Sequence, residues 1–176
     1  MIGHVRWAML ALGAAAAMAL APARAATPQE EALEAAQALS RAIMAQDVDA
    51  QMKLLPPTMY ARPGERDRVR AQKLHDKEVA IVNKQKYLSF EVKAPVQTLK
   101  VNAFTAVVVP YRSVLAEADG KLQVDSVIIA LTDEASGKWS AFDGSGQVTR
   151  TLKVIIPGYT QGLVVPPVAS KLIKGE

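Results

Sequence analysis

One stretch near the middle of the 176-residue chain, Leu122 to Gly144, restricts the fold more than any other. Its first half, Val124 to Leu131, is β-branched and apolar at both odd and even positions, which is typical of a strand covered on both faces. A polar, glycine-containing segment, Thr132 to Gly137, follows and leads into a second run from Trp139 to Phe142. Two such runs joined by a short turn indicate a β-hairpin. We therefore expect the rest of the chain to be organised around this hairpin.

The first 25 residues have the three parts of a secretory signal peptide. Arg6 lies in a short basic lead, an uncharged apolar run extends from Trp7 to Ala21, and Ala23-Arg24-Ala25 supplies the small residues required for cleavage. The run is shorter than the roughly 20 residues that a membrane-spanning helix needs. We expect residues 1–25 to be removed, residues 26–176 to form a single domain without a membrane span, and the product to be periplasmic.

Composition excludes several classes of protein. The chain has no cysteine, so neither a disulfide nor a lipid-modified cysteine can form. Its 21 Lys and Arg exceed its 17 Asp and Glu by only four, and two of the cations, Arg6 and Arg24, belong to the predicted signal peptide. So small an excess, with few aromatic residues, argues against nucleic acid as a partner.

Two helices are predicted directly after the cleavage point. Thr27 and Glu30, with a proline following the threonine, form a capping box that predicts a helix to about Gln46. Asp47 predicts the cap of a second, short helix. Pro56-Pro57 ends that helix because proline cannot continue the hydrogen-bond ladder.

A third helix is predicted from Glu65 to about Lys86. Ala71, Leu74 and Ile81 fall on one side of it, and Glu78 lies on the same side. If Glu78 points inward, its carboxylate lacks water and needs a partner, which makes it a candidate site residue. In the alternative, which we favour, the helix is rotated slightly and Glu78 lies at the edge of the apolar face.

The period then changes from helical to alternating. Leu88 to Val92 predicts a strand with one solvent-exposed face. Thr98 to about Ala118 predicts one long strand with a bend or bulge at Pro110, because proline cannot donate to a ladder. Asp119-Gly120 is a strong signal for a tight hairpin into the central strand. Together these segments predict about four antiparallel strands.

The last part of the chain contains two kinds of signal. Ser145 as a cap and Pro157-Gly158 as a stop favour a short helix between them. The tail from Gly162 onward is apolar but interrupted by prolines. We expect it to lie across the domain as an extended strap that does not join the sheet.

Three helices followed by long, bent antiparallel strands resemble the cone-shaped α+β architecture of the nuclear transport factor 2-like superfamily. The resemblance covers roughly residues 28 to 144, and it includes Lys138-Trp139 and Phe142-Asp143-Gly144 in the last two strands. It implies an α+β fold in which N-terminal helices pack on a strongly bent sheet. It does not imply one function, because the superfamily includes isomerases, dehydratases and binding proteins. No catalytic residue is carried over from it.

Few residues of the sequence are candidates for catalysis or for binding a metal or cofactor. After signal removal His75 is the only histidine, and its charged neighbours predict exposure on the third helix. A cysteine nucleophile and a multi-histidine metal site are excluded, and no cofactor motif is present. Asp143-Gly144-Ser145-Gly146 lacks the ligand spacing of a calcium loop and the downstream lysine of a phosphate loop, so we interpret it as a plain turn.

Two classes of function remain open. We prefer a non-enzymatic module that binds a small apolar molecule or an envelope protein, with a homodimer through the sheet as one assembly. The alternative is a small isomerase- or dehydratase-like enzyme with Glu78 or another carboxylate as general base and Tyr60, Tyr87 or Tyr111 as hydrogen-bond donor. A periplasmic lipid carrier of the same broad fold is a third possibility, which needs a large open cavity. An inward carboxylate facing a tyrosine would favour the enzyme, and an all-apolar lining would favour binding. The candidate pocket residues are Glu78, Tyr87, Tyr111 and Trp139, the last of which we expect to be buried.

Overall fold

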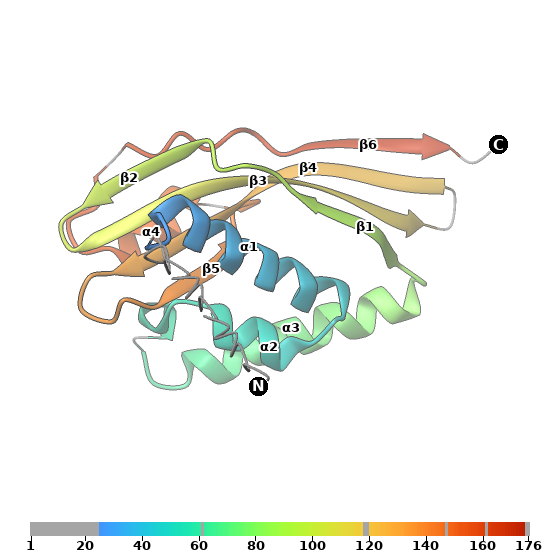
Figure 1. Ribbon diagram of the computed structural model, residues 1–176. Helices are drawn as coiled ribbons and strands as arrows, with labels where there is room; N and C mark the ends of the chain where they lie inside the picture. Colours follow the sequence, from blue (N-terminus) through green and yellow to red (C-terminus); the bar gives the residue numbers. More distant parts are fainter. Residues whose placement is uncertain (1–24, 61, 118–119, 147, 161, 175–176) are drawn as a thin grey trace, which may run out of the picture.

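The computed structural model describes residues 25–60, 62–117, 120–146, 148–160 and 162–174 (Figure 1). Most of the predicted signal peptide, residues 1–24, lies outside this part, as does Asp119 of the predicted hairpin turn. Within the described residues, no helix is both long and apolar enough to cross a lipid bilayer. The fold is α+β, as predicted: helices pack on a strongly curled antiparallel sheet.

The first two helices follow their predicted caps. α1 (Pro28–Met44) begins with a complete capping box, in which the Thr27 hydroxyl accepts from the Glu30 amide at 3.3 Å and the Glu30 carboxylate accepts from the Thr27 amide at 2.6 Å. α2 (Val48–Leu54) is capped by the Asp47 carboxylate. A short 3₁₀ turn, η1 (Pro57–Tyr60), begins at the second of the two prolines that end α2.

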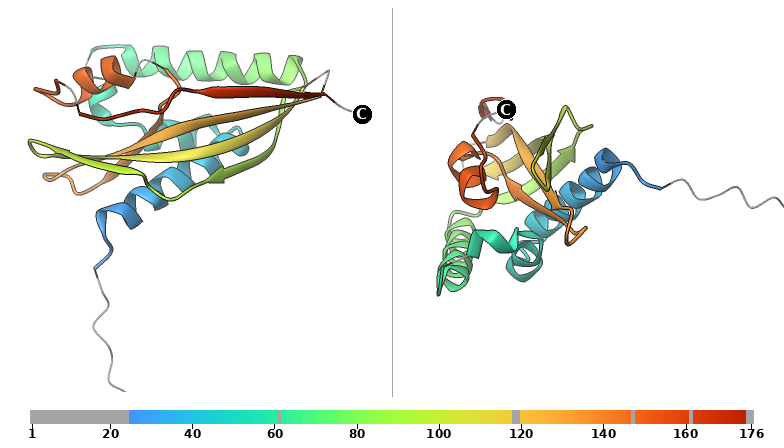
Figure 2. Two further views of the ribbon diagram at one scale, coloured as in Figure 1. Left: turned by 90° about the horizontal axis from the view of Figure 1, so that it is seen from above. Right: turned by 90° about the vertical axis from the view of Figure 1, so that its left-hand side faces the viewer.

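Within the described residues, six antiparallel strands form one sheet, where about four were predicted. β3 and β4 pair along their whole length and make the backbone of the sheet, with β1 and β2 on the outer edge of β3. Long paired strands twist, and the sheet curls into a half-barrel (Figures 1 and 2). The strands are β1 (Lys86–Val92), β2 (Gln97–Val101), β3 (Phe104–Glu117), β4 (Gly120–Asp133), β5 (Trp139–Asp143) and β6 (Ala169–Lys174).

β4 is the central strand, as its sequence predicts. Ser126 to Leu131 are six consecutive buried residues, so both faces of the strand are covered. The edge of β4 that faces away from β3 is shared: β6 pairs with its first half and β5 with its second. The predicted β4–β5 hairpin is therefore confirmed.

The two faces of the sheet carry separate hydrophobic cores. On the concave face, α1 packs through Leu39 against Val109 and Ile128. On the other face, α4 (Val148–Ile155) packs through Leu152 in the cluster that also contains Val108 and Ile129. Figure 2, seen along the sheet, shows α1 and α4 on opposite sides of it.

The segment predicted as one long strand is a hairpin. Asn102, with a φ of 52°, makes the turn between β2 and β3, and Val101 pairs directly with Phe104. Asparagine tolerates the left-handed conformation, so a turn signal was present without glycine. Pro110 pairs in register with Val127 and introduces no bulge, contrary to the prediction.

The irregularity predicted at Pro110 occurs instead in β1. The register shifts between Tyr87 and Ser89, where one strand has an extra residue relative to its partner. Leu88, predicted to alternate inward with Phe90 and Val92, is consequently 47% exposed. The bulge keeps Tyr87 on the concave face, opposite Leu115.

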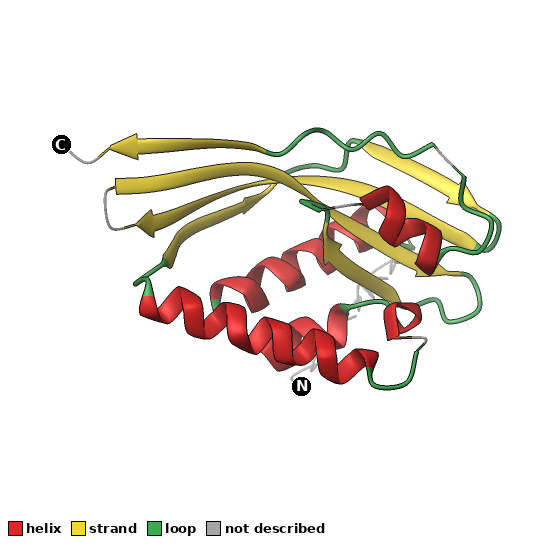
Figure 3. Cartoon of the chain, turned by 180° about the vertical axis from the view of Figure 1, so that it is seen from behind, coloured by secondary structure: helices red, strands yellow, loops and turns green. Residues whose placement is uncertain are grey.

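The C-terminal segment differs from the predicted strap. The short helix before Pro157 is present as α4, but the tail does not remain outside the sheet. Ala169 to Lys174 pair with β4 from Asp125 to Gly120, so the tail is an added edge strand, visible at the top of Figure 1 and in Figure 3. The prolines lie upstream of the pairing residues, where no ladder hydrogen bond is needed.

α3 (Glu65–Val82) is present as predicted, but its inward face is not the one that periodicity suggested. The structure describes every residue of this helix, and none of them is buried. The predicted apolar side is exposed, with Leu74 at 38% and Ile81 at 58%. After Glu65 at the start of the helix, the partly covered residues are Val69, Lys73, Lys77 and Ala80.

Candidate functional site

A cleft of about 320 Å³ lies between α3, the α1–α2 corner and the concave face of the sheet. Its volume is at the lower end of the range for small-molecule sites. Side chains from the helices and the sheet converge in it, and charged, amide, aromatic and aliphatic groups are all represented. The lining residues are Ile43, Gln46, Val48, Gln51, Lys73, Asp76, Lys77, Ala80, Gln85, Tyr87, Leu115 and Asp143.

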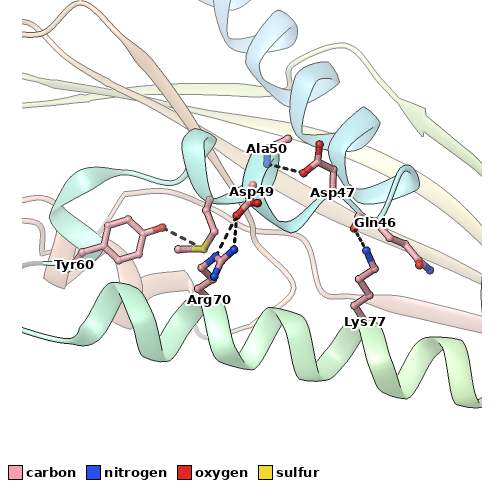
Figure 4. Close-up of polar contacts among 8 residues, drawn as sticks. Gln46, Asp47, Asp49, Ala50, Tyr60, Arg70 and Lys77 are labelled. Atoms are coloured by element: carbon pink, nitrogen blue, oxygen red, sulfur yellow. Dashed lines mark hydrogen bonds and ion pairs between the residues drawn. The ribbon is translucent and has the colours of Figure 1, made fainter.

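Polar contacts hold the α3 wall of this cleft in place. The Lys73 Nζ donates to Gln51 Oε1 at 3.1 Å, and one turn further along the helix the Lys77 Nζ donates to the main-chain oxygen of Gln46 at 3.0 Å. Figure 4 shows the second contact together with the fork of Arg70 on the Asp49 carboxylate. Because α3 buries no apolar side chain fully, these contacts replace the hydrophobic packing that anchors the other long helix.

Strand register brings a tyrosine and a carboxylate together on the concave face. Tyr111 in β3 lies opposite Ser126, and Asp143 in β5 lies opposite Ile128, so all four side chains share that face. The Tyr111 hydroxyl donates to Asp143 Oδ1 at 3.3 Å. Asp143 also accepts from the Ser145 amide at 2.9 Å and the Ser145 hydroxyl at 3.0 Å, which makes the predicted plain turn.

An aromatic row runs beside the cleft. Phe90 stacks on Tyr111 with ring centroids 4.4 Å apart, and Tyr87 lies 6.0 Å from Phe90. Burial raises the pKa of Tyr111 well above that of free tyrosine, and the nearby Asp143 charge adds to the rise. Burial followed by the same charge also raises the pKa of Tyr87. Both hydroxyls therefore remain protonated donors at neutral pH.

Lys73 is one of two partly buried lysines that line the cleft. Burial lowers the pKa of its amine, and the negative charges of Asp143 and Asp76 oppose that effect. In the part of the chain that the structure describes, its hydrogen-bond acceptor is the neutral amide oxygen of Gln51. Among the described residues, no carboxylate lies within ion-pair distance of the Lys73 amine.

Ser126 contributes an unsatisfied hydroxyl behind Tyr111. The residue is 5% exposed, and its Oγ has no hydrogen-bonding partner of ordinary geometry among the described residues. It is close enough to the Tyr111 hydroxyl to oppose the rise in the pKa of that group. A buried hydroxyl without a hydrogen-bonding partner costs free energy.

The four predicted pocket residues do not meet in one place. Tyr87 lines the cleft. Tyr111 is not among the lining residues, but its hydroxyl donates to Asp143, which is. Glu78 is exposed and is not among the lining residues. Trp139 lies at the other end of β5, partly rather than fully buried, and its Nε1 donates to Glu31 Oε2 at 2.8 Å.

Sequence reasoning missed the charged half of the cleft. Lys73 and Lys77 lie outside the apolar side predicted for α3, and Asp143 was not among the predicted pocket residues. The spacing of Val69, Lys73, Lys77 and Ala80 marks a helix face, but it is an unusual one because its centre is two lysines. No local sequence signal shows that Asp143, at the end of β5, lies in the same cleft as Lys73 and Lys77.

Other hollows lie outside the concave face. One of about 740 Å³ lies between η1, the start of α3 and α4, and one of about 630 Å³ lies between α4 and residues 165–168. Both are larger, but neither combines tyrosines with a carboxylate and a lysine. The described residues contain no group of three or more potential metal-ligating side chains.

Comparisons with profiles of known protein families, with characterised proteins and with solved structures find no significant match.

Proposed function

We propose that this chain is an exported, periplasmic protein that binds a small molecule in the cleft between α3 and the concave face of its sheet. The observation that carries the proposal is the convergence of Lys73, Tyr87 and Asp143 on one cleft from α3, β1 and β5. Side chains so distant in sequence meet with donors, an acceptor and an aromatic surface, which is the usual composition of a ligand site. The helices on a curled sheet support membership of the nuclear transport factor 2-like superfamily as part of the same proposal.

The lining indicates a ligand that is not purely apolar. Ile43 and Leu115 offer an aliphatic surface, while Lys73 and Asp143 offer opposite charges. Burying an unpaired charge against a hydrocarbon is unfavourable. A ligand with an apolar part and at least one polar end satisfies both surfaces, whereas a lipid carrier needs a larger apolar cavity.

Enzymatic activity is the second candidate, and one observation favours it. The Tyr111 hydroxyl on the Asp143 carboxylate is an inward carboxylate facing a tyrosine, the arrangement expected of an isomerase- or dehydratase-like site. Binding remains our first proposal because three donors, from Tyr111 and Ser145, already occupy Asp143. A carboxylate has about four acceptor positions, so little of it is left to take a proton from substrate.

Blocking the cleft tests the proposal. Ala80 lines the cleft, whereas Ala71 lies on the exposed side of the same helix. Untargeted mass spectrometry of material released from purified periplasmic protein should identify a small molecule in the parent and in Ala71→Trp, but not in Ala80→Trp. Retention of the same molecule by Ala80→Trp would place the binding site elsewhere.

Asp143→Asn separates the two candidates once a ligand is known. The amide keeps the shape of the side chain but cannot act as a base at neutral pH. If the protein is an enzyme, Asp143→Asn should still bind substrate and lose turnover, whereas in a binding protein the variant should change only the ligand affinity. Glu78→Gln, on the exposed part of α3, is the matched control for loss of one carboxylate.

A further inference from the structure

We propose that Lys73 is a nucleophilic amine that forms an imine with small aldehydes or ketones entering the cleft. The inference rests on the proposed cleft being open to small molecules, and it extends that proposal by assigning the ligand class. Lys73 lies at the centre of the inward face of α3, among the residues that line the cleft. Its hydrogen-bonding partner is a neutral amide.

The surroundings of Lys73 differ from those of a structural lysine. Structural lysines are commonly paired with a carboxylate or extended into water, and pairing keeps the amine charged. Here Gln51 Oε1 orients the amine at 3.1 Å without supplying a negative charge. Partial burial in addition lowers the pKa of the amine, which increases the neutral, nucleophilic fraction.

Two groups that can assist imine formation line the same cleft. In the first step the Lys73 Nζ lone pair attacks the carbonyl carbon, and one proton passes from the nitrogen to the carbonyl oxygen, which gives a neutral carbinolamine. In the second step the carbinolamine hydroxyl takes up a proton from solvent and leaves as water, the nitrogen lone pair forms the carbon–nitrogen double bond of a protonated imine, and loss of its proton to solvent gives the neutral imine. Tyr87 can donate a hydrogen bond to the oxygen, and Asp143 can stabilise the positive charge of a protonated imine.

The charge environment of Lys73 comes from several elements. Asp143 at the end of β5 raises the pKa of the amine, as does Asp76 on α3 itself. On α2 the nearest carboxylate, Asp49, is held by Arg70. The charged and titratable residues that face the cleft are Lys73, Asp76, Lys77, Tyr87 and Asp143.

Reductive trapping tests the inference. The full mature chain is incubated near neutral pH with butyraldehyde and sodium cyanoborohydride, which converts an imine to a stable secondary amine, and peptide mapping then measures the rate at each lysine. We expect Lys73 to be labelled at least a few-fold faster than Lys77, which lines the same cleft one turn further along α3. Equal rates at Lys73 and Lys77 would overturn the proposal.

Three variants make the result specific. Ala80→Trp should remove the preference for Lys73 by closing the cleft, while Ala71→Trp should keep it. Asp143→Asn should move the pH dependence of labelling at Lys73 to lower pH, because one charge that raises the pKa of the amine is gone. An unchanged preference in Ala80→Trp would contradict a reaction inside the cleft. If Ala80 controls retention of a small molecule but Lys73 is not preferred, the imine inference fails while the proposed binding function stands.

Discussion

Trp139 on β5 donates a hydrogen bond from its indole Nε1 to the Glu31 carboxylate on α1 at 2.8 Å. The contact joins the first helix to the last strand of the central hairpin, 108 residues apart. It also explains why Trp139 is only partly buried. The indole nitrogen needs a polar partner, and the ring therefore lies at the border of the concave core.

Partial burial sets the expected cost of removing Trp139. Trp139→Ala should destabilise the fold by about 2 kcal/mol, less than the cost of deleting a fully buried aromatic residue. Trp139→Phe keeps most of the packing and loses the hydrogen bond, so it should cost about 1 kcal/mol. Denaturant unfolding of both variants measures the difference. An Ala variant that unfolds at the parent midpoint would show that the ring contributes nothing to the core.

Gly144 is required by close packing on β4. A Cβ atom built there lies 2.6 Å from Val127 Cγ2, 3.0 Å from the Val127 carbonyl oxygen and 3.3 Å from Ile129 Cγ1. Gly144→Ala should therefore destabilise by about 1 to 3 kcal/mol through overpacking. Gly146, two residues further on, has nothing within 4 Å of the same position, and Gly146→Ala should stay within about 0.5 kcal/mol of the parent. Equal thermal stability of the two variants would contradict this packing.

The exposed side of α3 should tolerate truncation. Ile81 is 58% exposed, whereas Leu39 on α1 is 1% exposed. Ile81→Ala should change the free energy of unfolding by about 0.5 kcal/mol or less, and Leu39→Ala should lower it by about 2 to 5 kcal/mol. Chemical denaturation of the two variants checks the contrast. A large loss in Ile81→Ala would mean that this side of α3 is covered in solution.

The raised pKa of Tyr111 predicts a loss of stability in alkali. An unfolded tyrosine ionises near its ordinary value of 10.0, whereas the folded protein keeps the Tyr111 proton to higher pH. The contribution of this group is therefore complete below about pH 10 and declines as the pH rises above it, because the unfolded state then binds fewer protons. Tyr111→Phe should lose less stability than the parent between about pH 9 and about pH 11. Parallel slopes for the two proteins over this range would refute the assignment.

Export predicts a defined N-terminus. If Ala23 and Ala25 direct cleavage, the mature protein begins at Ala26. Intact-mass analysis of periplasmic material should find that species. Protein that retains Trp7 would contradict removal of the signal peptide, and protein found only in the cytoplasm would contradict the proposed location.

Local features were determined by the sequence alone because their partners are close along the chain. The capping box of Thr27 and Glu30 joins residues three positions apart, and the run from Val124 to Leu131 needs no register to be identified as a doubly covered strand. The β4–β5 hairpin follows from the same kind of signal. These elements were enough to predict the α+β class and the position of its central strand.

The candidate site was decided only by tertiary structure. Tyr111 and Asp143 meet because the registers of β3, β4 and β5 place them on one face, and register depends on pairing between distant segments. The phase of α3 follows from polar anchors on α2, such as Gln51 for Lys73, rather than from its own apolar residues. The tail from Ala169 joins the sheet because β5 leaves half of the β4 edge unpaired, and backbone groups along a free edge accept another strand.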